Sequence, residues 1–198
     1  MKADIGSTTK YQQQKAKAIE AAASVFASKG YHGASTKDIA THLGIRQGSL
    51  YYYFKSKEKA LEEVCLIALK SYVGKMETIF EQELPIEEKL SMVVRAHLSS
   101  YRENNAALRV HNEQRLYLPK NRRDKLKDLG STYRQHLEQI FINGVDKGKL
   151  RSDLDSHFAA LSLIGLCNYW GSMLSRERGL SLDETIQKCT DITLYGCN

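Results

Sequence analysis

Residues 35–57 of this 198-residue chain read STKDIATHLGIRQGSLYYYFKSK. Ser35 and Thr36 offer hydroxyl caps for a helix whose first turn contains Asp38, a charge that suits the positive end of the helix dipole. Gly44 ends this helix, because glycine adopts the left-handed backbone conformation without a steric cost. A third helix is expected from about Gln47 to Tyr53. The stretch therefore predicts two short helices joined by a tight turn.

A helix with one apolar face precedes this stretch. Its apolar positions follow the helical repeat and include Ile19, Ala22, Ala23 and Phe26. Lys29-Gly30 is a typical helix end. Leu50 and Phe54, four residues apart, are expected to bury the third helix against the first two. Three helices with a glycine turn between the second and the third make a helix-turn-helix unit.

The rest of the chain is also predicted to be helical. Its amphipathic repeats are delimited by Leu84-Pro85, Asn104-Asn105, Pro119, Gly148, Asp153 or Asp155, and Gly179 with Ser181. The chain has only 2 Pro and 13 Gly, too few for the many turns of a β-sandwich or barrel. The sequence therefore predicts an all-α fold of about nine helices.

The positive charge of the chain lies in its first part. The formal net charge is +6; residues 1–60 hold 10 basic and 4 acidic side chains, and the other 138 residues hold 19 of each sign. This asymmetry indicates a basic N-terminal module joined to a neutral body. The N-terminus resembles no signal peptide, the apolar run of residues 158–174 is interrupted by polar side chains, and the four cysteines have no metal spacing. A reduced, cytoplasmic protein with no membrane partner is expected.

The side chains expected on the exposed face of the third helix suit duplex DNA. Arg46 and Gln47 can bond base edges in the major groove, and Gly48 lets the backbone come close to the DNA. Hydroxyl and backbone N–H groups reach phosphates. The expected DNA-binding residues are Thr36, Arg46, Gln47, Gly48, Ser49, Tyr51, Tyr52 and Lys57.

The pattern of these positions resembles the DNA-binding domain of the TetR family. It covers about a quarter of the chain and runs through Phe26, Gly30-Tyr31, Thr36, Asp38-Ile39-Ala40, Leu43-Gly44-Ile45, Gly48-Ser49-Leu50, Tyr51-Tyr52-Tyr53-Phe54 and Lys55-Ser56-Lys57-Glu58. The eight DNA-binding residues match the family's contact positions, and Tyr53 departs from a frequent His. The resemblance implies a ligand-responsive repressor. It would bind a near-palindromic, double-stranded DNA operator as a homodimer through its last two helices, and a small-molecule effector in its body would release it.

Three parts of the chain follow from this resemblance. We expect a disordered arm at residues 1–9, the helix-turn-helix domain at 10–56, and a helical effector-binding and dimerisation domain at 57–198. The stretch Phe158–Leu174 is apolar nearly all round, so more than one of its sides must be covered. Tyr169, Trp170 and Met173 suit an interface with a partner chain. A core helix of a monomer is the alternative.

Polar groups beside apolar helical faces are the candidates for the effector site. They are His97, Tyr101, His111, Asn112, Glu113 and Arg115, and the expected ligand-binding residues among them are His97, Tyr101, His111 and Arg115. The stretches 112–115, 122–123 and 148–153 are similar to TetR-type regulators that respond to acyl-CoA thioesters. On that resemblance Arg109, Arg115 or Arg122 would meet the phosphates, while the acyl chain fills the apolar core. The effector would be a fatty acyl-CoA or another apolar compound, and no cofactor is expected.

Other classes of function fit less well. The chain has no GxSxG, HExxH, Walker or Rossmann pattern, so an enzyme is not expected. A metal-responsive regulator is the alternative, with His97, His111 and Glu113 as metal ligands. Asp153, Asp155 and His157 are more simply explained by capping of the helix that follows. An RNA-binding or membrane-surface module fits less well than groove entry, because small residues stand at the centre of the exposed face.

Overall fold

The computed structural model describes residues 9–103, 105–177 and 179–196. In this part of the chain the elements are α1 (Lys10–Gly33), α2 (Thr36–Leu43), α3 (Gln47–Leu50), α4 (Lys57–Glu81), α5 (Ile86–Glu103), α6 (Asn105–Gln114), a 3-10 turn η1 (Arg115–Tyr117), α7 (Lys120–Asp146), α8 (Ser156–Arg176) and α9 (Leu182–Tyr195). These described residues form nine α-helices and no strand, so the predicted all-α fold is confirmed.

The local signals of the first three helices act as the sequence predicts. The Ser35 hydroxyl accepts the backbone N–H of Asp38 at the start of α2, and the Asp38 carboxylate accepts the backbone N–H of Ser35 in return. Gly44 ends α2 with a φ of 72°. Gly30 has a φ of 71°, but the chain makes one more turn to Gly33, so α1 bends at the predicted end instead of stopping there.

Two helix ends differ from the prediction. The α-helix of α3 stops at Leu50, because the backbone N–H groups of Tyr52 and Tyr53 bond three residues back and tighten the chain into turns. That tightening brings Phe54, which is 1% exposed, into the core beside Leu50. The fourth helix ends at Glu81 instead of Leu84, and Pro85 directly precedes α5.

The predicted N-terminal arm is described only at its last residue. Residues 1–8 and the predicted break at Asn104 lie outside the described residues. Thr9 is the N-cap of α1: its hydroxyl accepts the backbone N–H of Gln12, whose side chain accepts the backbone N–H of Thr9.

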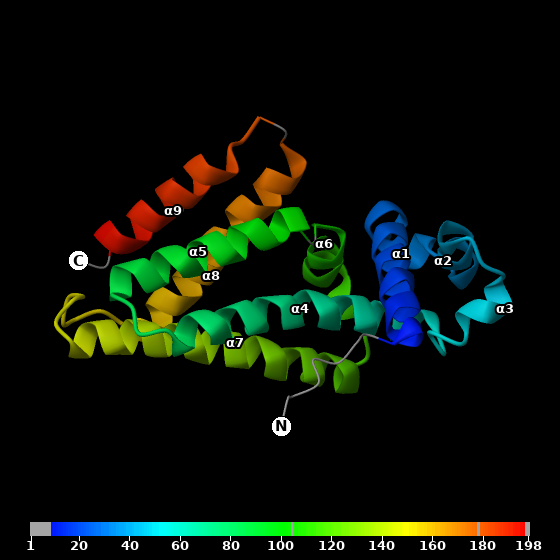
Figure 1. Ribbon diagram of the computed structural model, residues 1–198, viewed down its shortest axis with the longest axis horizontal. Coiled ribbons are helices and arrows are strands. Elements are labelled where there is room, and N and C mark those ends of the chain that lie inside the picture. The colour runs from blue at the N-terminus through cyan, green and yellow to red at the C-terminus, as the bar shows by residue number, and fades with distance from the viewer. Residues whose placement is uncertain (1–8, 104, 178, 197–198) are drawn as a thin grey trace, which may run out of the picture.

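The helices α1, α2 and α3, which we call the head, lie at one end of the molecule, and the other helices form an elongated body (Figure 1). The two parts share one hydrophobic core. The amide of Gln114, at the end of α6, donates to the backbone carbonyl of Phe26 in α1 at 2.9 Å. The ring of Tyr117 in η1 stacks on Tyr31 with 5.5 Å between centroids. The head is therefore anchored on α6 and η1 as well as on α4.

In the body, α4 and α7 run side by side, and α5 packs against α8 and α9 (Figure 1). At Gly171, α8 approaches α5 so closely that an added Cβ would lie 2.2 Å from the Tyr101 ring. By length and composition alone α8 could also cross a membrane, and 28% of its apolar stretch is buried within the protein. The rest of that stretch leaves an apolar face outside the core.

Candidate DNA-binding surface and effector cavity

The predicted DNA-binding residues other than Lys57 belong to α2, to α3 or to the segments that flank α3. Arg46, Gln47, Gly48 and Ser49 are exposed, and Thr36 is half-buried. Tyr52 is 70% exposed, whereas Leu50 on the inner side of the same turn is 1% exposed. The buried and exposed sides of α3 are therefore those that the sequence predicts.

The side chain of Gln47 is held in place by α2. Its amide nitrogen donates to the Thr36 hydroxyl at 3.1 Å, so the two helices of the motif are linked at the predicted recognition face. A Cβ added at Gly48 would meet no heavy atom within 4 Å, and its φ is not in the left-handed region. Nothing inside the described part of the protein therefore requires a glycine at this position.

Lys57 begins α4, as predicted, and its side chain turns inwards to the head. Its ammonium donates to the backbone carbonyls of Tyr31 and Ala34 at 2.9 and 3.0 Å and lies 4.4 Å from the centre of the Tyr31 ring. Because α1 ends at Gly33, these carbonyls have no helical partners, and Lys57 satisfies them. The side chain joins α4 to the end of α1 and is not extended towards solvent. Its phosphate contact stays a prediction.

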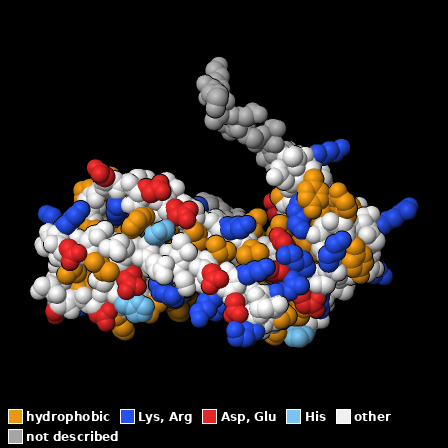
Figure 2. All heavy atoms as spheres, turned by 90° about the horizontal axis from the view of Figure 1, so that it is seen from below, with side chains coloured by type: hydrophobic (Ala, Val, Ile, Leu, Met, Phe, Trp, Pro, Cys, Tyr) orange, Lys and Arg blue, Asp and Glu red, His pale blue; other side chains and the backbone are white. Residues whose placement is uncertain are grey.

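The sequence interpretation missed an aromatic cluster beside the recognition helix. Tyr11 of α1 packs edge-on against Tyr52, with 5.4 Å between centroids, and stacks on Tyr53 at 6.3 Å. Lys15, one turn further along α1, donates to the backbone carbonyl of Tyr53. These contacts fix the turn that follows α3. Figure 2 shows Lys and Arg side chains projecting from the same end of the molecule.

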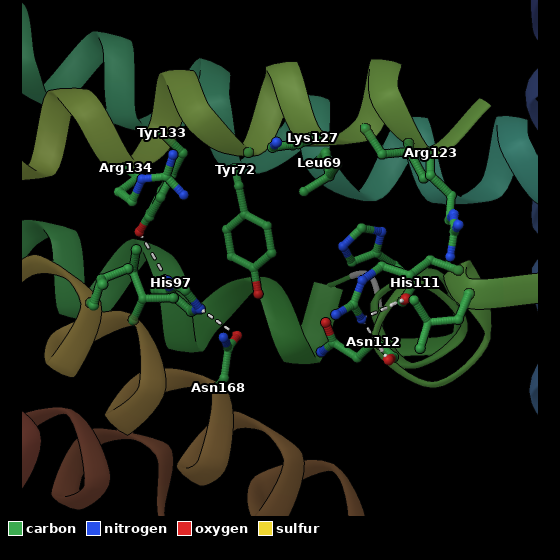
Figure 3. Close-up of a pocket in the computed structure, with 16 residues that line it drawn as sticks. Leu69, Tyr72, His97, His111, Asn112, Arg123, Lys127, Tyr133, Arg134 and Asn168 are labelled. Atoms are coloured by element: carbon green, nitrogen blue, oxygen red, sulfur yellow. Dashed lines mark hydrogen bonds between the residues drawn. The ribbon is translucent and has the colours of Figure 1, made fainter. Parts of the chain in front are cut away.

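A cavity of about 480 Å³ lies between five helices of the body, next to α4, which leads away from the head (Figure 3). It is lined by Leu69, Tyr72, His97, His111, Asn112, Arg115, Leu116, Arg123, Leu126, Lys127, Gly130, Tyr133, Arg134, Leu161, Ile164 and Asn168. Three of the four predicted effector residues are in this lining. The fourth, Tyr101, lies behind it and bonds the cavity residues Asn112 and Asn168.

A chain of hydrogen bonds crosses the inner wall of the cavity. The Tyr133 hydroxyl lies 2.9 Å from Nδ1 of His97, and Nε2 of His97 lies 3.2 Å from Oδ1 of Asn168 (Figure 3). The Tyr101 hydroxyl donates to the same oxygen of Asn168 at 3.0 Å and accepts from the amide of Asn112 at 3.0 Å. Burial lowers the pKa of His97 to about 4, so this imidazole is neutral at physiological pH.

Cationic side chains on α7 also line the cavity; the sequence interpretation singled out the stretch that contains Arg123 and missed the other two. They are Arg123, Lys127 and Arg134. Of the arginines proposed for phosphate recognition, Arg109 pairs with Glu113 at 3.3 Å outside the cavity, and Arg122 pairs with the buried Glu62 of α4. Only Arg115 lines the cavity, and it donates to the backbone carbonyls of His111 and Asn112.

The metal alternative has no support. Within the described residues no three His, Cys, Asp or Glu side chains come together in a way that could hold a metal ion. Asp155 caps α8 by accepting the backbone N–H of Phe158 at 2.9 Å, and His157 pairs with Glu138 at 3.0 Å. Burial, assisted by the nearby charge of Arg115, lowers the pKa of His111 to about 4.

The last two helices expose large apolar side chains. They are Phe158, Leu161, Tyr169, Ile192 and Tyr195, with exposed fractions between 43% and 78%. Trp170, by contrast, is half-buried and packs against the core. Several exposed apolar side chains on one pair of helices are typical of an interaction surface and unusual on an ordinary polar surface.

A helix-turn-helix head with a polar outer face, carried by a helical body that encloses a cavity, defines a DNA-binding transcriptional regulator. Residues 18–64 match the family described as "Bacterial regulatory proteins, tetR family", and residues 83–196 match the family "Tetracyclin repressor-like, C-terminal domain". The chain belongs to the TetR family and is a transcriptional regulator, not an enzyme.

Curated relatives extend over most of the chain. The fatty acid metabolism regulator protein of Bacillus subtilis is 29% identical over 74% of this chain and 76% of its own length. The HTH-type transcriptional repressor KstR2 of Mycolicibacterium smegmatis is 30% identical over 69% of this chain and 67% of its own length. The predicted class, a ligand-responsive repressor, is confirmed by this family membership and these relatives.

Solved structures share the fold. The TetR family regulator PfmR of Thermus thermophilus has a TM-score of 0.84 and 28% identity, and the match covers 90% of this chain and 97% of that one. FadR of Bacillus subtilis, solved in complex with stearoyl-CoA, has a TM-score of 0.77 and 22% identity, with coverage of 92% and 99%.

Proposed function

We propose that this protein represses transcription in the cytoplasm, where its DNA partner lies, and that a long-chain acyl-CoA thioester releases it from its operator. The head at residues 10–56 would read DNA, and residues 57–198 would hold the effector and form the homodimer. The observation that carries the proposal is the cavity beside α4, which combines an apolar lining with cationic side chains of α7.

Duplex DNA is the partner that the outer face of the head fits. Arg46 and Gln47 stand at the start of α3, where side chains can reach base edges in the major groove. Ser49, Tyr51, Tyr52 and Thr36 offer hydroxyl groups for phosphates on either side of the recognition helix.

A homodimer through α8 and α9 supports this mode of binding. A two-fold dimer presents two heads to two half-sites, so a near-palindromic operator mirrors the symmetry of the protein. The exposed Phe158, Tyr169 and Ile192 would be covered by the same two helices of a second copy.

An acyl-CoA thioester suits both halves of the cavity lining. The apolar residues Leu69, Leu126, Leu161 and Ile164 would surround the acyl chain. The cationic Arg123, Lys127 and Arg134 would bind anionic groups of the CoA moiety, as Arg and Lys do for phosphates. The fatty acid metabolism regulator and the stearoyl-CoA complex among the relatives agree with this choice of ligand.

Effector binding would reach the head through three shared contacts. Tyr72 and Leu69 of the cavity belong to α4, the helix that continues from the head. The ion pair of Arg122 with Glu62 joins α7 to the same helix, and Gln114 bonds Phe26. An effector that fits a second arrangement of α4 better than the first would shift the heads apart. The effector can lower the affinity for DNA at most by the ratio of the effector's own affinities for the two arrangements of α4.

The test begins with selection of operator DNA from a random pool by the purified protein. Palmitoyl-CoA should then release the labelled operator, whereas coenzyme A alone should not. Arg123→Ala should weaken palmitoyl-CoA binding by about tenfold, since a charge-assisted contact is lost. Lys125→Ala, which removes an exposed cation of α7 outside the cavity, is the matched control. No release by any acyl-CoA from eight to eighteen carbons would refute the effector assignment.

A further inference from the structure

The hydroxyl group of Tyr72 is buried and makes no hydrogen bond of ordinary geometry. Tyr72 is 9% exposed, and among the described residues its oxygen meets no partner at normal length and angle, although the Tyr101 hydroxyl lies close enough to interact with it. Its ring packs against His97 at 4.5 Å and Tyr133 at 5.9 Å between centroids, so the side chain cannot turn away easily. Figure 3 shows the phenol reaching from α4 across the cavity towards Asn168 and Asn112. A buried hydroxyl without an ordinary hydrogen bond is costly, which indicates that something else in the cavity bonds it.

The neighbouring amide of Asn168 is oriented by other residues. Its oxygen Oδ1 is approached by the Tyr101 hydroxyl at 3.0 Å and by Nε2 of His97 at 3.2 Å. A carbonyl oxygen only accepts, so the neutral His97 carries its proton on Nε2 and donates it to Asn168. Nδ1 of His97 then accepts from the Tyr133 hydroxyl at 2.9 Å. His97 acts as a positioning residue.

This orientation leaves the amide nitrogen of Asn168 unused within the described part of the chain. Asn168 and Tyr72 both line the cavity, so its inner wall offers an N–H group and an O–H group. Burial raises the pKa of Tyr72 far above its ordinary value, which keeps this hydroxyl protonated and able to donate. Two donors in one wall fit an acceptor atom, and a plain hydrocarbon chain would leave both without a partner.

We propose that Tyr72 and Asn168 form a subsite that binds a hydrogen-bond-accepting oxygen of the effector, inside the cavity and apart from the cationic residues of α7. The inference deepens the proposed function and rests on it for the identity of the ligand. The oxygen can come from the thioester carbonyl of an acyl-CoA or from a keto group on its acyl chain. Both sources supply the same chemistry, and Tyr72 selects against a ligand that lacks it.

The experiment compares ligands that differ by one oxygen. Palmitoyl-CoA is paired with S-hexadecyl-CoA, in which a CH₂ group replaces the thioester carbonyl. Hexadecanoate is paired with oxohexadecanoates that carry a ketone at carbon 3, 7, 11 or 15. Calorimetric titration measures each Kd for the wild type, for Tyr72→Phe and for Tyr117→Phe. Tyr117 is an exposed tyrosine of η1 outside the cavity, and the control removes the same atom there.

The measured quantity is the preference for the oxygen-bearing member of each pair. In the wild type one pair should show a preference that Tyr72→Phe reduces by about three- to tenfold, the range expected for one hydrogen bond. Tyr117→Phe should leave the preference unchanged. The ratio of preferences cancels the different solvation of the two ligands, because both variants meet the same pair. Tyr72→Phe should not lower thermal stability, since the buried hydroxyl that it removes makes no hydrogen bond of ordinary geometry.

The outcomes separate this inference from the proposed function. Equal preferences in the wild type and Tyr72→Phe, with palmitoyl-CoA still releasing DNA, would overturn the oxygen subsite and leave the effector assignment intact. A Tyr72-dependent preference among the oxohexadecanoates, with no binding of either CoA ligand, would support the subsite and refute the acyl-CoA assignment. Absence of binding by every oxygen-bearing probe would overturn both.

Discussion

Replacing Gly48 by alanine tests whether the exposed face of α3 meets DNA. A Cβ at this position meets no heavy atom within 4 Å, and the backbone is not in the left-handed region. The folded protein therefore accepts the methyl group without strain. Alanine in a helix is favoured over glycine by up to about 1 kcal/mol, so the melting temperature should stay the same or rise by about 2 °C.

The operator affinity should change in the opposite direction. If the backbone at residue 48 lies against DNA, a methyl group there forces a displacement that costs about 1–3 kcal/mol, as overpacking does in a protein core. A dimer with two heads suffers this cost twice. The expected loss is about 2–6 kcal/mol, which corresponds to a Kd raised at least about thirtyfold.

Fluorescence anisotropy with a labelled operator fragment measures this loss, and a thermal melt of the same sample measures stability. Gly74→Ala is the matched control, because Gly74 is an exposed glycine in the middle of α4 whose Cβ would also meet nothing. It should leave operator affinity unchanged. If Gly48→Ala binds the operator as tightly as the parent protein, the assigned recognition face is wrong.

Four further substitutions test single contacts. Gln47→Ala should relax the preference at one or two base pairs by about 1–3 kcal/mol, as measured by titration with singly substituted operators, and an unchanged preference would remove Gln47 from base recognition. Lys57→Ala should lower the melting temperature, because two carbonyls lose their donor, and the predicted phosphate contact should lower the salt slope of DNA binding by about one unit; an unchanged slope would remove Lys57 from the DNA contacts. Hydrogen bonds from Lys29 and Ser35 lower the pKa of Asp38 to about 2, so the stability it adds is present above pH 4 and lost as the pH falls towards 2; acid unfolding of Asp38→Ala should lack this component. Gly171→Ala should destabilise the protein by about 1–3 kcal/mol in urea unfolding, because its Cβ would lie 2.2 Å from the Tyr101 ring, and a neutral result would show that α5 and α8 separate freely.

The head was predictable because its signals act over a few residues. Ser35 and Asp38 cap each other three positions apart, Gly44 ends α2 in a left-handed conformation, and Leu50 and Phe54, four positions apart, are both buried in the core. Such interactions join residues that are only a few positions apart, so the spacing in the sequence predicts them, and the structure confirms each of them. The clustering of positive charge in residues 1–60 is likewise a property of the chain that no folding step changes.

The cavity was only partly predictable, because its lining comes from five helices that are far apart in the chain. His97, His111 and Arg115 were found as polar residues beside apolar faces, but Asn168 lies 71 residues from its partner His97. Arg122 and Arg123 are neighbours, yet Arg122 pairs with Glu62 and Arg123 lines the cavity. Periodicity places both on one helix and does not say which neighbouring helix each faces.

By itself the sequence determined the fold class, the helix-turn-helix unit and the side of α3 that faces outwards. These follow from short-range capping, backbone geometry and the separation of apolar from polar side chains along a helix. Only the tertiary structure decided that Lys57 turns inwards to the end of α1 and that α7 supplies cations to the cavity. Only the tertiary structure shows that the buried Tyr72 hydroxyl makes no hydrogen bond of ordinary geometry. The reason is physical: the partner of a long polar side chain is whichever group the packing of distant helices brings within about 3 Å.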